Sequence, residues 1–331
     1  MRIGLTYDLR ADWSPRPGEP PDLYAEFDSA ETITALRTTL AGLGHEPCPI
    51  GTAANVAPYF SQESVDLVFN IAEGFLGGRG RESQVPCLLD LLKVPYVFSE
   101  PLVLALTLDK AMAKRLLLAE GIPTARFVEV AAVSELDGLA LAPPLFLKPV
   151  HEGSAKGVSA ASLVSRPDDL RPRVVSLLAA YRQPVLIEEY LPGEEFTVAI
   201  LGTGSRAEVL GTMRVSVRGD AHNVYGYEAK EFCESLVDYT PREALPPALR
   251  QEVEAVALAA WRALGCADAG RVDVRCNARG EPQFLEVNPL PGLHPTHSDL
   301  PIIATQRGLS YSDLIGRILT AALERHGLPQ T

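Results

Sequence analysis

The chain has 331 residues, a length that fits about two ordinary domains or three small ones. Its residues are 47% hydrophobic and 22% charged, which is typical of a globular protein with a full core. The formal net charge of −12 argues against a general nucleic-acid-binding or acidic-membrane-binding protein, since both need a basic surface. A small basic pocket for phosphate is compatible with this charge.

No apolar run approaches the ~20 residues of a membrane span, and the N-terminus lacks the pattern of a signal peptide. The five cysteines form no CxxC pair, which indicates reduced thiols rather than a disulfide framework or a zinc site. We therefore expect a cytoplasmic protein with neither a membrane nor a nucleic-acid partner.

The first hundred residues alternate between strand and helix patterns. Residues 2–7 and 65–71 are short apolar runs typical of buried strands, and 96–98 resembles a further strand. Between the first two runs, apolar residues with helical spacing follow Asp28, which we expect to be the helix N-cap. This alternation predicts a parallel α/β unit.

Later segments alternate in the same way, with glycine-rich and proline-rich loops between them. The patterns predict helices over 109–120, 248–264 and 311–325, strands over 145–149, 185–189 and 195–201, and a hairpin over 271–288. The fold class predicted for the whole chain is α/β.

The predicted hairpin carries alternating polar side chains. Because alternate residues of a strand share a face, Arg271 and Asp273 point the same way, and Glu286 and Asn288 share a face of the return strand. Two carboxylates and an amide oxygen beside an arginine suit a hard divalent cation that also touches phosphate. A solvated strand face is the alternative at this stage.

Lysine is scarce in this chain and occurs only at positions 93, 110, 114, 148, 156 and 230. Lys148 is followed by a loop with glycines at 153 and 157, a pattern in which backbone N–H groups can hold a phosphate. A plain surface loop is the alternative, because the P-loop and GxGxxG patterns are both absent.

Five motifs in order resemble the D-alanine–D-alanine ligases, which belong to the ATP-grasp carboxylate–amine ligases. The strongest is Gly270-Arg-Val-Asp-Val followed by Phe284-Leu-Glu-Val-Asn-Pro-Leu-Pro-Gly292. The other motifs cover residues 107–115, 147–157, 186–197 and 227–230. The resemblance extends from near residue 65 to near residue 320.

The resemblance implies a three-lobed ATP-grasp architecture. Its parts would be an N-terminal α/β substrate domain with a parallel sheet over 1–104, a central ATP-grasp subdomain over 105–189 and a C-terminal subdomain over 190–331. ATP would lie between the last two parts. The implied reaction makes an acyl phosphate from one amino acid and joins it to the amine of a second, giving a dipeptide of the D-alanyl-D-alanine type, ADP and phosphate. Such a dipeptide would serve cell-wall peptidoglycan synthesis.

The resemblance also implies roles for individual residues. The ATP-binding set comprises Lys110, Lys148, Glu152, Gly153, Ser154, Gly157, Glu188, Glu189, Tyr190, Leu191, Glu195 and Lys230. Two Mg²⁺ (or Mn²⁺) ions would be bound by Asp273, Glu286 and Asn288. Arg271 and the Gly292 backbone N–H would stabilise the oxyanion, Ser154 would assist catalysis, and Ser298 would bind the carboxylate of the second amino acid. Lys93 and Lys114 are expected to be solvated surface charges. For Lys156, a solvated charge on the loop is the alternative interpretation.

The chain departs from the family on the substrate side. The family's GGxSxE stretch is replaced by residues 22–28, where Glu26 is the candidate for binding the ammonium of the first substrate. The HGxxGEDG loop is also different, over residues 73–82. Glu231 stands where the family has a tyrosine, and we expect it to favour an ammonium-bearing second substrate. Its alternative role is to pair with a surface arginine.

The expected partners are small amino acids, and a homodimer is the oligomer that the family analogy suggests. One alternative function is a dipeptide ligase of specialised metabolism with other amino acids. Another is a nucleotide-binding regulator without catalysis, which the complete metal set and Arg271 disfavour, because binding alone needs no oxyanion arginine.

Overall fold

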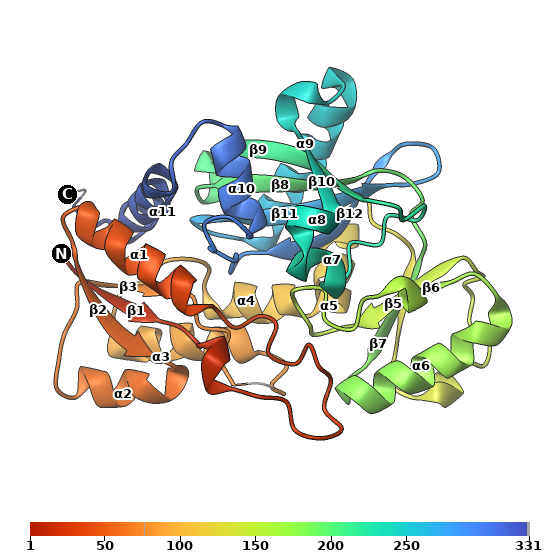
Figure 1. Cartoon of the computed structure of the whole chain (residues 1–331), viewed down its shortest axis with the longest axis horizontal. Coiled ribbons are helices and arrows are strands. Elements are labelled where there is room, and N and C mark those ends of the chain that lie inside the picture. Colours follow the sequence, from red (N-terminus) through yellow and green to blue (C-terminus); the bar gives the residue numbers. More distant parts are fainter. Residues whose placement is uncertain (76, 330–331) are drawn as a thin grey trace.

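The computed structural model describes residues 1–75 and 77–329 as an α/β protein with three sheets (Figure 1). This confirms the predicted fold class. The sheets occupy residues 2–70, 127–189 and 195–288, so that one sheet falls in each of the three predicted segments. Among the described residues, no helix has both the length and the apolar character that crossing a bilayer requires.

The N-terminal sheet is parallel, with strands in the order β2-β1-β3. Its elements are β1 (Arg2–Thr6), β2 (Glu46–Gly51), β3 (Leu67–Asn70), α1 (Ala30–Gly42), α2 (Ala53–Phe60), α3 (Gln84–Leu92) and α4 (Pro101–Leu108). The pairing confirms the predicted parallel unit. β2 was not predicted because Pro47 and Pro49 interrupt the strand pattern. It lies at the edge of the sheet, where proline is tolerated.

Two expectations for this part of the chain are wrong. Residues 96–98 make a single bridge from Tyr96 to Val68 instead of a strand, because Phe98 adopts a left-handed conformation with φ +77°. The N-cap of α1 is Ser29 rather than Asp28, since the Ser29 hydroxyl accepts a hydrogen bond from the Thr32 N–H (3.1 Å).

The central sheet is antiparallel, in the order β4-β7-β5-β6. Its strands are β4 (Phe127–Val130), β5 (Leu145–Pro149), β6 (Leu163–Val164) and β7 (Val185–Glu189), with α5 (Lys110–Ala119) before it and α6 (Pro167–Tyr181) against one face. Leu145 and Leu147 of β5 pack toward α6. Alternation along the strand therefore leaves Phe146 and Lys148 on the opposite face.

The C-terminal sheet is antiparallel, in the order β10-β9-β8-β11-β12. Its elements are β8 (Glu195–Leu201), β9 (Glu208–Val217), β10 (Val237–Pro241), β11 (Ala269–Cys276), β12 (Pro282–Asn288), the short helices α7 (Tyr227–Glu231) and α8 (Cys233–Leu236), and α9 (Pro247–Leu264). Trp261 of α9 packs with Val272 and Val274 of β11. The polar residues that alternate with these valines therefore lie on the other face of the sheet.

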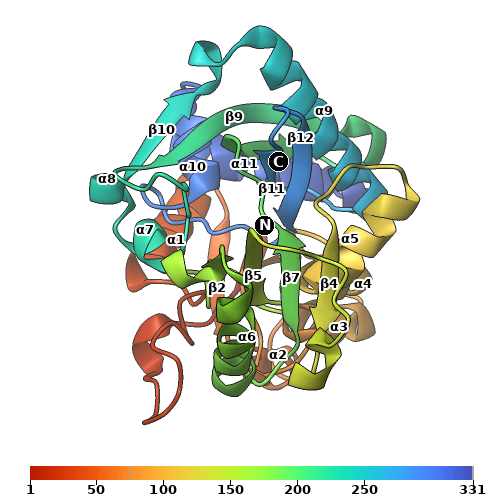
Figure 2. The same cartoon turned by 90° about the vertical axis from the view of Figure 1, so that its right-hand side faces the viewer.

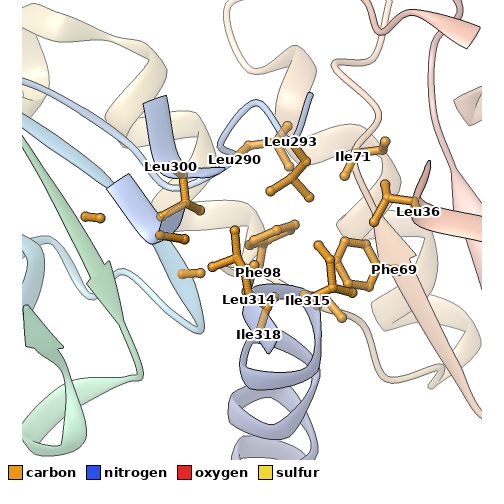
Figure 3. Packing of buried hydrophobic residues seen from close by; sticks show 14 of the residues in the cluster. Leu36, Phe69, Ile71, Phe98, Leu290, Leu293, Leu300, Leu314, Ile315 and Ile318 are labelled. Carbon is orange, nitrogen blue, oxygen red and sulfur yellow. The ribbon is translucent and has the colours of Figure 1, made fainter. Parts of the chain in front are cut away.

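The last two helices, α10 (Asp299–Gln306) and α11 (Tyr311–His326), share a core with the N-terminal sheet. Figure 3 shows this core, in which Leu314, Ile315 and Ile318 of α11 gather with Leu36, Phe69 and Phe98. Leu290, Leu293 and Leu300 also belong to it. Leu290 and Leu293 thus anchor the loop between β12 and α10, and Leu300 anchors the start of α10. The predicted helices over 109–120, 248–264 and 311–325, the later strands and the hairpin are confirmed.

Candidate active site

A cleft lies between the central sheet and the C-terminal sheet, which Figure 2 shows one above the other. Ala125, Phe146 and Leu285 give it an apolar surface of the kind that accepts a flat ring. Most of the predicted ATP and metal residues line it, namely Lys110, Lys148, Glu152, Glu188, Glu189, Tyr190, Leu191, Glu195, Lys230, Asp273 and Glu286.

Two lysines reach this cleft from regular elements. Lys148 lies on β5 with its Nζ 3.0 Å from a carboxylate oxygen of Glu188, and Lys110 begins α5 with its Nζ 3.7 Å from Glu286. Burial lowers the pKa of Lys110. Burial has the same tendency at Lys148, but Glu188 and Glu286 outweigh it and raise the pKa of that lysine. Two buried ammonium groups at one cleft favour a phosphate ligand.

Lys114 is also buried, so the expectation that it is a solvated charge is wrong. Its side chain has no exposed surface, and its Nζ lies 2.5 Å from Glu188. Lys110 and Lys114 are four residues apart on α5, a spacing that puts both on the same face of the helix. That spacing was the available sequence signal. Lys93 is exposed, as expected.

The glycine loop over residues 151–157 is attached to the N-terminal segment. The Gly153 N–H donates to Glu26 (2.5 Å) and the Gly157 N–H donates to Asp22 (2.8 Å). Asp22 also accepts from the Tyr181 hydroxyl (2.8 Å). Carboxylate oxygens thus occupy backbone donors that were predicted to meet phosphate, and Gly157 faces a cavity other than the cleft. The phosphate contacts of these glycines stay a prediction.

Glu26 lies in a buried cluster of charged side chains. It accepts hydrogen bonds from Arg81 (2.7 and 2.8 Å) and from Lys156 (2.6 Å), and Lys156 also pairs with Glu152. Burial opposes ionisation of Glu26, but Arg81 and Lys156 lower its pKa to about 2. Lys156 has 1% of its side chain exposed, so the solvated alternative is wrong for this lysine. Glu26 already has two cationic partners in the chain, and its predicted contact with a substrate ammonium stays a prediction.

The β11–β12 hairpin brings the predicted metal residues together. Asp273 is paired with Glu286 across the strands, and Arg271 is paired with Asn288. Asp273 accepts from the Thr197 hydroxyl (2.9 Å) and forms an ion pair with Arg271. Burial raises the pKa of Asp273. It acts in the same sense on Glu286, but the lysines beside that carboxylate, Lys110 first, lower its pKa.

These residues fit a divalent cation. Asp273 and Glu286 offer carboxylate oxygens and Asn288 offers an amide oxygen, which are the hard ligands that such an ion prefers. Residues 1–75 and 77–329 contain no cluster of three His, Cys, Asp or Glu side chains suited to a metal. The mixed set of two carboxylates and one amide is therefore the candidate.

A second pocket adjoins the cleft and shares Tyr225 and Lys230 with it. The predicted residues that line it are Ser154, Lys230, Glu231, Arg271, Gly292 and Ser298. Position 292 needs glycine because a Cβ there would lie 2.8 Å from the Ser298 Oγ. That Oγ accepts a hydrogen bond from the His294 N–H (3.0 Å). The predicted oxyanion and acceptor residues thus lie around one cavity next to the ATP cleft.

The family model for the D-Ala–D-Ala ligase C-terminus matches residues 116–320 of this chain. The chain belongs to the D-alanine–D-alanine ligase family. The D-alanine–D-alanine ligase of Bordetella petrii is 37% identical over 250 residues, which are 74% of this chain and 73% of that protein. The enzyme of Bordetella avium is 35% identical over 306 residues, covering 89% of this chain and 92% of its own length.

Solved structures agree with this membership. The D-alanine–D-alanine ligase from Bacillus anthracis complexed with ATP matches with a TM-score of 0.75 and 25% sequence identity, over 99% of both chains. The VanG D-Ala:D-Ser ligase from Enterococcus faecalis shares the fold with a TM-score of 0.71 and 21% identity. The ATP-grasp architecture implied by the sequence motifs is therefore confirmed.

Glu231, where the D-alanine–D-alanine ligase family has a tyrosine, pairs with an arginine. Arg10 belongs to the short 3-10 helix η1 (Arg10–Asp12) and donates to both Glu231 oxygens (3.2 and 3.3 Å) and to the Tyr227 hydroxyl (3.1 Å). The Arg10 and Glu231 side chains are 41% and 37% exposed. The alternative role for Glu231 is thus present in the structure, while its influence on the substrate stays a prediction.

Sequence reasoning gave no site role to several residues of this D-alanine–D-alanine ligase family site, among them Arg10, Arg81, Tyr225 and Asp299. Arg81 lies in residues 73–82, which differ from the HGxxGEDG loop of the family. A positive charge that the family loop does not have was therefore an available signal. Asp299 directly follows Ser298, so a charge beside a predicted substrate residue was also an available signal. Arg10 carried no signal, because its partners are more than 200 residues away in the sequence.

Proposed function

We propose that this protein is an ATP-dependent ligase that joins two amino acids through an acyl phosphate and releases ADP and phosphate. The observation that carries this proposal is the connection between the two cavities. Lys230 and Tyr225 line both the ATP cleft and the pocket of Arg271, Gly292 and Ser298. A phosphoryl group at the end of the cleft would therefore lie next to the site where a second substrate is bound.

The cleft residues would bind and orient ATP. The apolar wall formed by Ala125, Phe146 and Leu285 suits the adenine, and Lys110 and Lys148 suit the phosphates. These lysines are held in place by carboxylates before ATP arrives, so little reorganisation is needed when charge develops on the transferring group. Their position favours transfer of the terminal phosphoryl group to a substrate carboxylate.

Arg271 and Gly292 would act in the second half of the reaction. When the amine of the second amino acid attacks the acyl phosphate, negative charge develops on the carbonyl oxygen. The Arg271 guanidinium and the Gly292 N–H lie on the wall of the pocket where that oxygen would form, and both can donate hydrogen bonds to it. The nitrogen then loses a proton to solvent, the carbonyl re-forms, and the C–O bond to phosphate breaks with its electron pair leaving on the phosphate, which gives the peptide bond.

Asp273, Glu286 and Asn288 would bind Mg²⁺ or Mn²⁺, two ions by analogy with the family. When bound, such ions offset the negative charge of the ATP phosphates. In the structure Asp273 forms an ion pair with Arg271, and Glu286 forms one with Lys110. A bound metal ion would share these carboxylates with the two basic side chains. We propose D-alanine as the first amino acid to examine at both substrate positions, because the curated relatives are named for it.

The test is a phosphate-release screen over D- and L-amino acids, offered singly and in pairs, with the nucleotide product identified. We expect amino-acid-dependent formation of ADP, and a dipeptide detected by mass spectrometry. AMP and pyrophosphate as stoichiometric products would contradict the acyl-phosphate route. Tight ATP binding with no turnover on any amino acid would instead support the non-catalytic regulator.

A further inference from the structure

The acceptor pocket contains a carboxylate to which the proposed reaction gives no role. Asp299 is the first residue of α10, directly after Ser298, and lines the pocket together with Arg271 and Gly292. Its side chain is 6% exposed. One carboxylate oxygen accepts a hydrogen bond from the Tyr225 hydroxyl (3.2 Å), and the other lies 3.5 Å from the Arg271 Nε.

The charges around Asp299 do not balance within the chain. Arg271 has Asp273 as its closer acidic partner and Asp299 as a more distant one, so a single guanidinium serves two carboxylates. The other acid of the pocket, Glu231, has Arg10 as a partner of its own. Among the residues that the structure describes, the ion pair that Asp299 forms is therefore a long one, at 3.5 Å, with an arginine that also pairs with Asp273.

We propose that Asp299 binds the ammonium group of the second amino acid and so selects an amine-bearing acceptor. This inference rests on the proposed ligase function. The ammonium must release one proton to solvent before its nitrogen can attack, and that nitrogen must then lie close to the carbonyl carbon whose oxygen is bound by Arg271 and the Gly292 N–H. Asp299 lines the same pocket, with a carboxylate oxygen 3.5 Å from the Arg271 Nε, so it is near enough to contact a nitrogen that attacks this carbon.

The opposite charges of the pocket fit the remainder of an amino-acid zwitterion. Lys230 and Ser298 line the same cavity and offer an ammonium and a hydroxyl to the acceptor carboxylate. With Asp299 at the amine and these groups at the carboxylate, a free amino acid is bound at both ends. A hydroxy acid of the same shape gains nothing from Asp299, whose carboxylate then keeps only the Tyr225 hydrogen bond and the long contact with Arg271.

The experiment compares the native enzyme with Asp299→Asn, which keeps the size of the side chain and its ability to accept from Tyr225. Rates of ADP release are measured with the second amino acid varied, and then with hydroxylamine as the acceptor, which is largely uncharged at neutral pH. We expect the KM for the second amino acid to rise about 10- to 100-fold, the range for loss of one charge-assisted hydrogen bond. The KM values for ATP and the first amino acid, and hydroxamate formation, should change less than about twofold, within ordinary experimental scatter in KM.

Two comparison variants sharpen the result. Glu231→Gln removes the other pocket acid, and because Arg10 already pairs with it we expect a smaller rise in the KM for the second amino acid. Asp168→Asn removes a carboxylate that is 89% exposed on α6 and controls for net charge alone.

Three results would overturn the inference. The first is an unchanged KM for the second amino acid in Asp299→Asn. The second is an equal loss of activity with every substrate, hydroxylamine included, which would mean that Asp299 only supports Arg271. The third is a larger rise in the KM for the second amino acid in Glu231→Gln than in Asp299→Asn. A native enzyme that releases ADP with no amino acid would refute the ligase proposal itself, and the inference with it.

Discussion

Glu26 shows how one carboxylate can support two segments of the chain at once. It binds Arg81 in the 3-10 helix (Arg81–Ser83) before α3, and it binds the Gly153 N–H and Lys156 of the glycine loop. The Glu26 side chain is 3% exposed, so its removal would leave two buried cations short of a partner. Breaking a buried ion pair from one side is costly because the remaining charge stays desolvated.

We therefore expect Glu26→Gln to lower the free energy of unfolding at neutral pH by about 3–5 kcal/mol. The pKa of Glu26 is lowered on folding to about 2 from an ordinary value of 4.5. Its contribution is thus complete above about pH 4.5 and is lost as the pH falls through about 2. Denaturant unfolding of both proteins from pH 7 to pH 2.5 measures the difference, which should shrink on acidification. A constant difference would place the stabilisation elsewhere.

The same variant separates two roles for Glu26. If Glu26 binds the first substrate, its loss should raise the KM for that amino acid far more than the KM for ATP. If it mainly holds the glycine loop over the cleft, the KM for ATP should rise at least as much. Steady-state kinetics with each substrate varied in turn distinguishes these outcomes.

Glu286 and Asp273 provide a prediction for the metal. We expect Glu286→Gln and Asp273→Asn each to abolish turnover, because each removes one charge from the proposed Mg²⁺ site. Each also breaks a buried ion pair, with Lys110 or with Arg271, so we expect a folded protein with a lower free energy of unfolding. Glu281→Gln is the matched control, since Glu281 lies beside the turn of the same hairpin with 51% of its side chain exposed. Near-normal turnover of either site variant at saturating Mg²⁺ would exclude this face of the hairpin as the metal site.

Among the elements, the glycine loop has a steric requirement that links it to a strand of the ATP cleft. Gly157 adopts φ +76°, and a Cβ there would lie 2.7 Å from the Pro149 ring and 3.0 Å from Tyr181. A side chain at this position would push the loop away from β5, the strand that carries Lys148. The conformation of the loop and the position of that lysine are therefore linked.

We expect Gly157→Ala to raise the KM for ATP and to destabilise the fold by more than the ~1–2 kcal/mol that a left-handed alanine costs by itself. Gly138→Ala is the control, because Gly138 has φ +87° and no atom within 4 Å of the added Cβ. Gly138→Ala should lower the free energy of unfolding by the cost of the left-handed backbone alone, without changing the KM for ATP. Equal kinetics for the two variants would show that the loop tolerates displacement.

Local patterns predicted most regular elements, and long-range contacts account for what they missed. Valines alternating with charged residues in β11 identified the hairpin and its polar face, because that information lies within a few residues. The Glu26 cluster joins residues 26, 81 and 156, and Arg10 meets residue 231. Sequence spacing carries no signal for such pairs. Lys114 was misjudged because its charge was given more weight than its position on the buried face of α5.

At the scale of the whole molecule, the first and last parts of the chain form one body. Leu314 of α11 is fully buried in the core that includes Leu36 and Phe69. We expect Leu314→Ala to lower the free energy of unfolding by about 2–5 kcal/mol through the cavity it leaves. Leu102→Ala, at a position that is 77% exposed on α4, should change it by less than about 0.5 kcal/mol.

Because this core is shared, the N-terminal sheet and α11 should lose structure in a single transition. Hydrogen exchange of β1 and α11 amides in Leu314→Ala measures this directly. Faster exchange confined to α11 would show that the N-terminal sheet is stable without it.

The shared core also determines when the protein can fold during its synthesis. The ribosome makes β1 well before α11, which covers the same core. At about 5–20 residues per second, some 300 residues separate the two by roughly 15–60 s. For that time the apolar side chains of the N-terminal sheet lack their final cover, and we expect nascent chains stalled before residue 311 to recruit chaperones and to be cleaved readily by proteases. Release of α11 from the exit tunnel would then complete the N-terminal lobe and fix the loop of Gly292 and Ser298, so that the acceptor pocket forms only after α11 has been made.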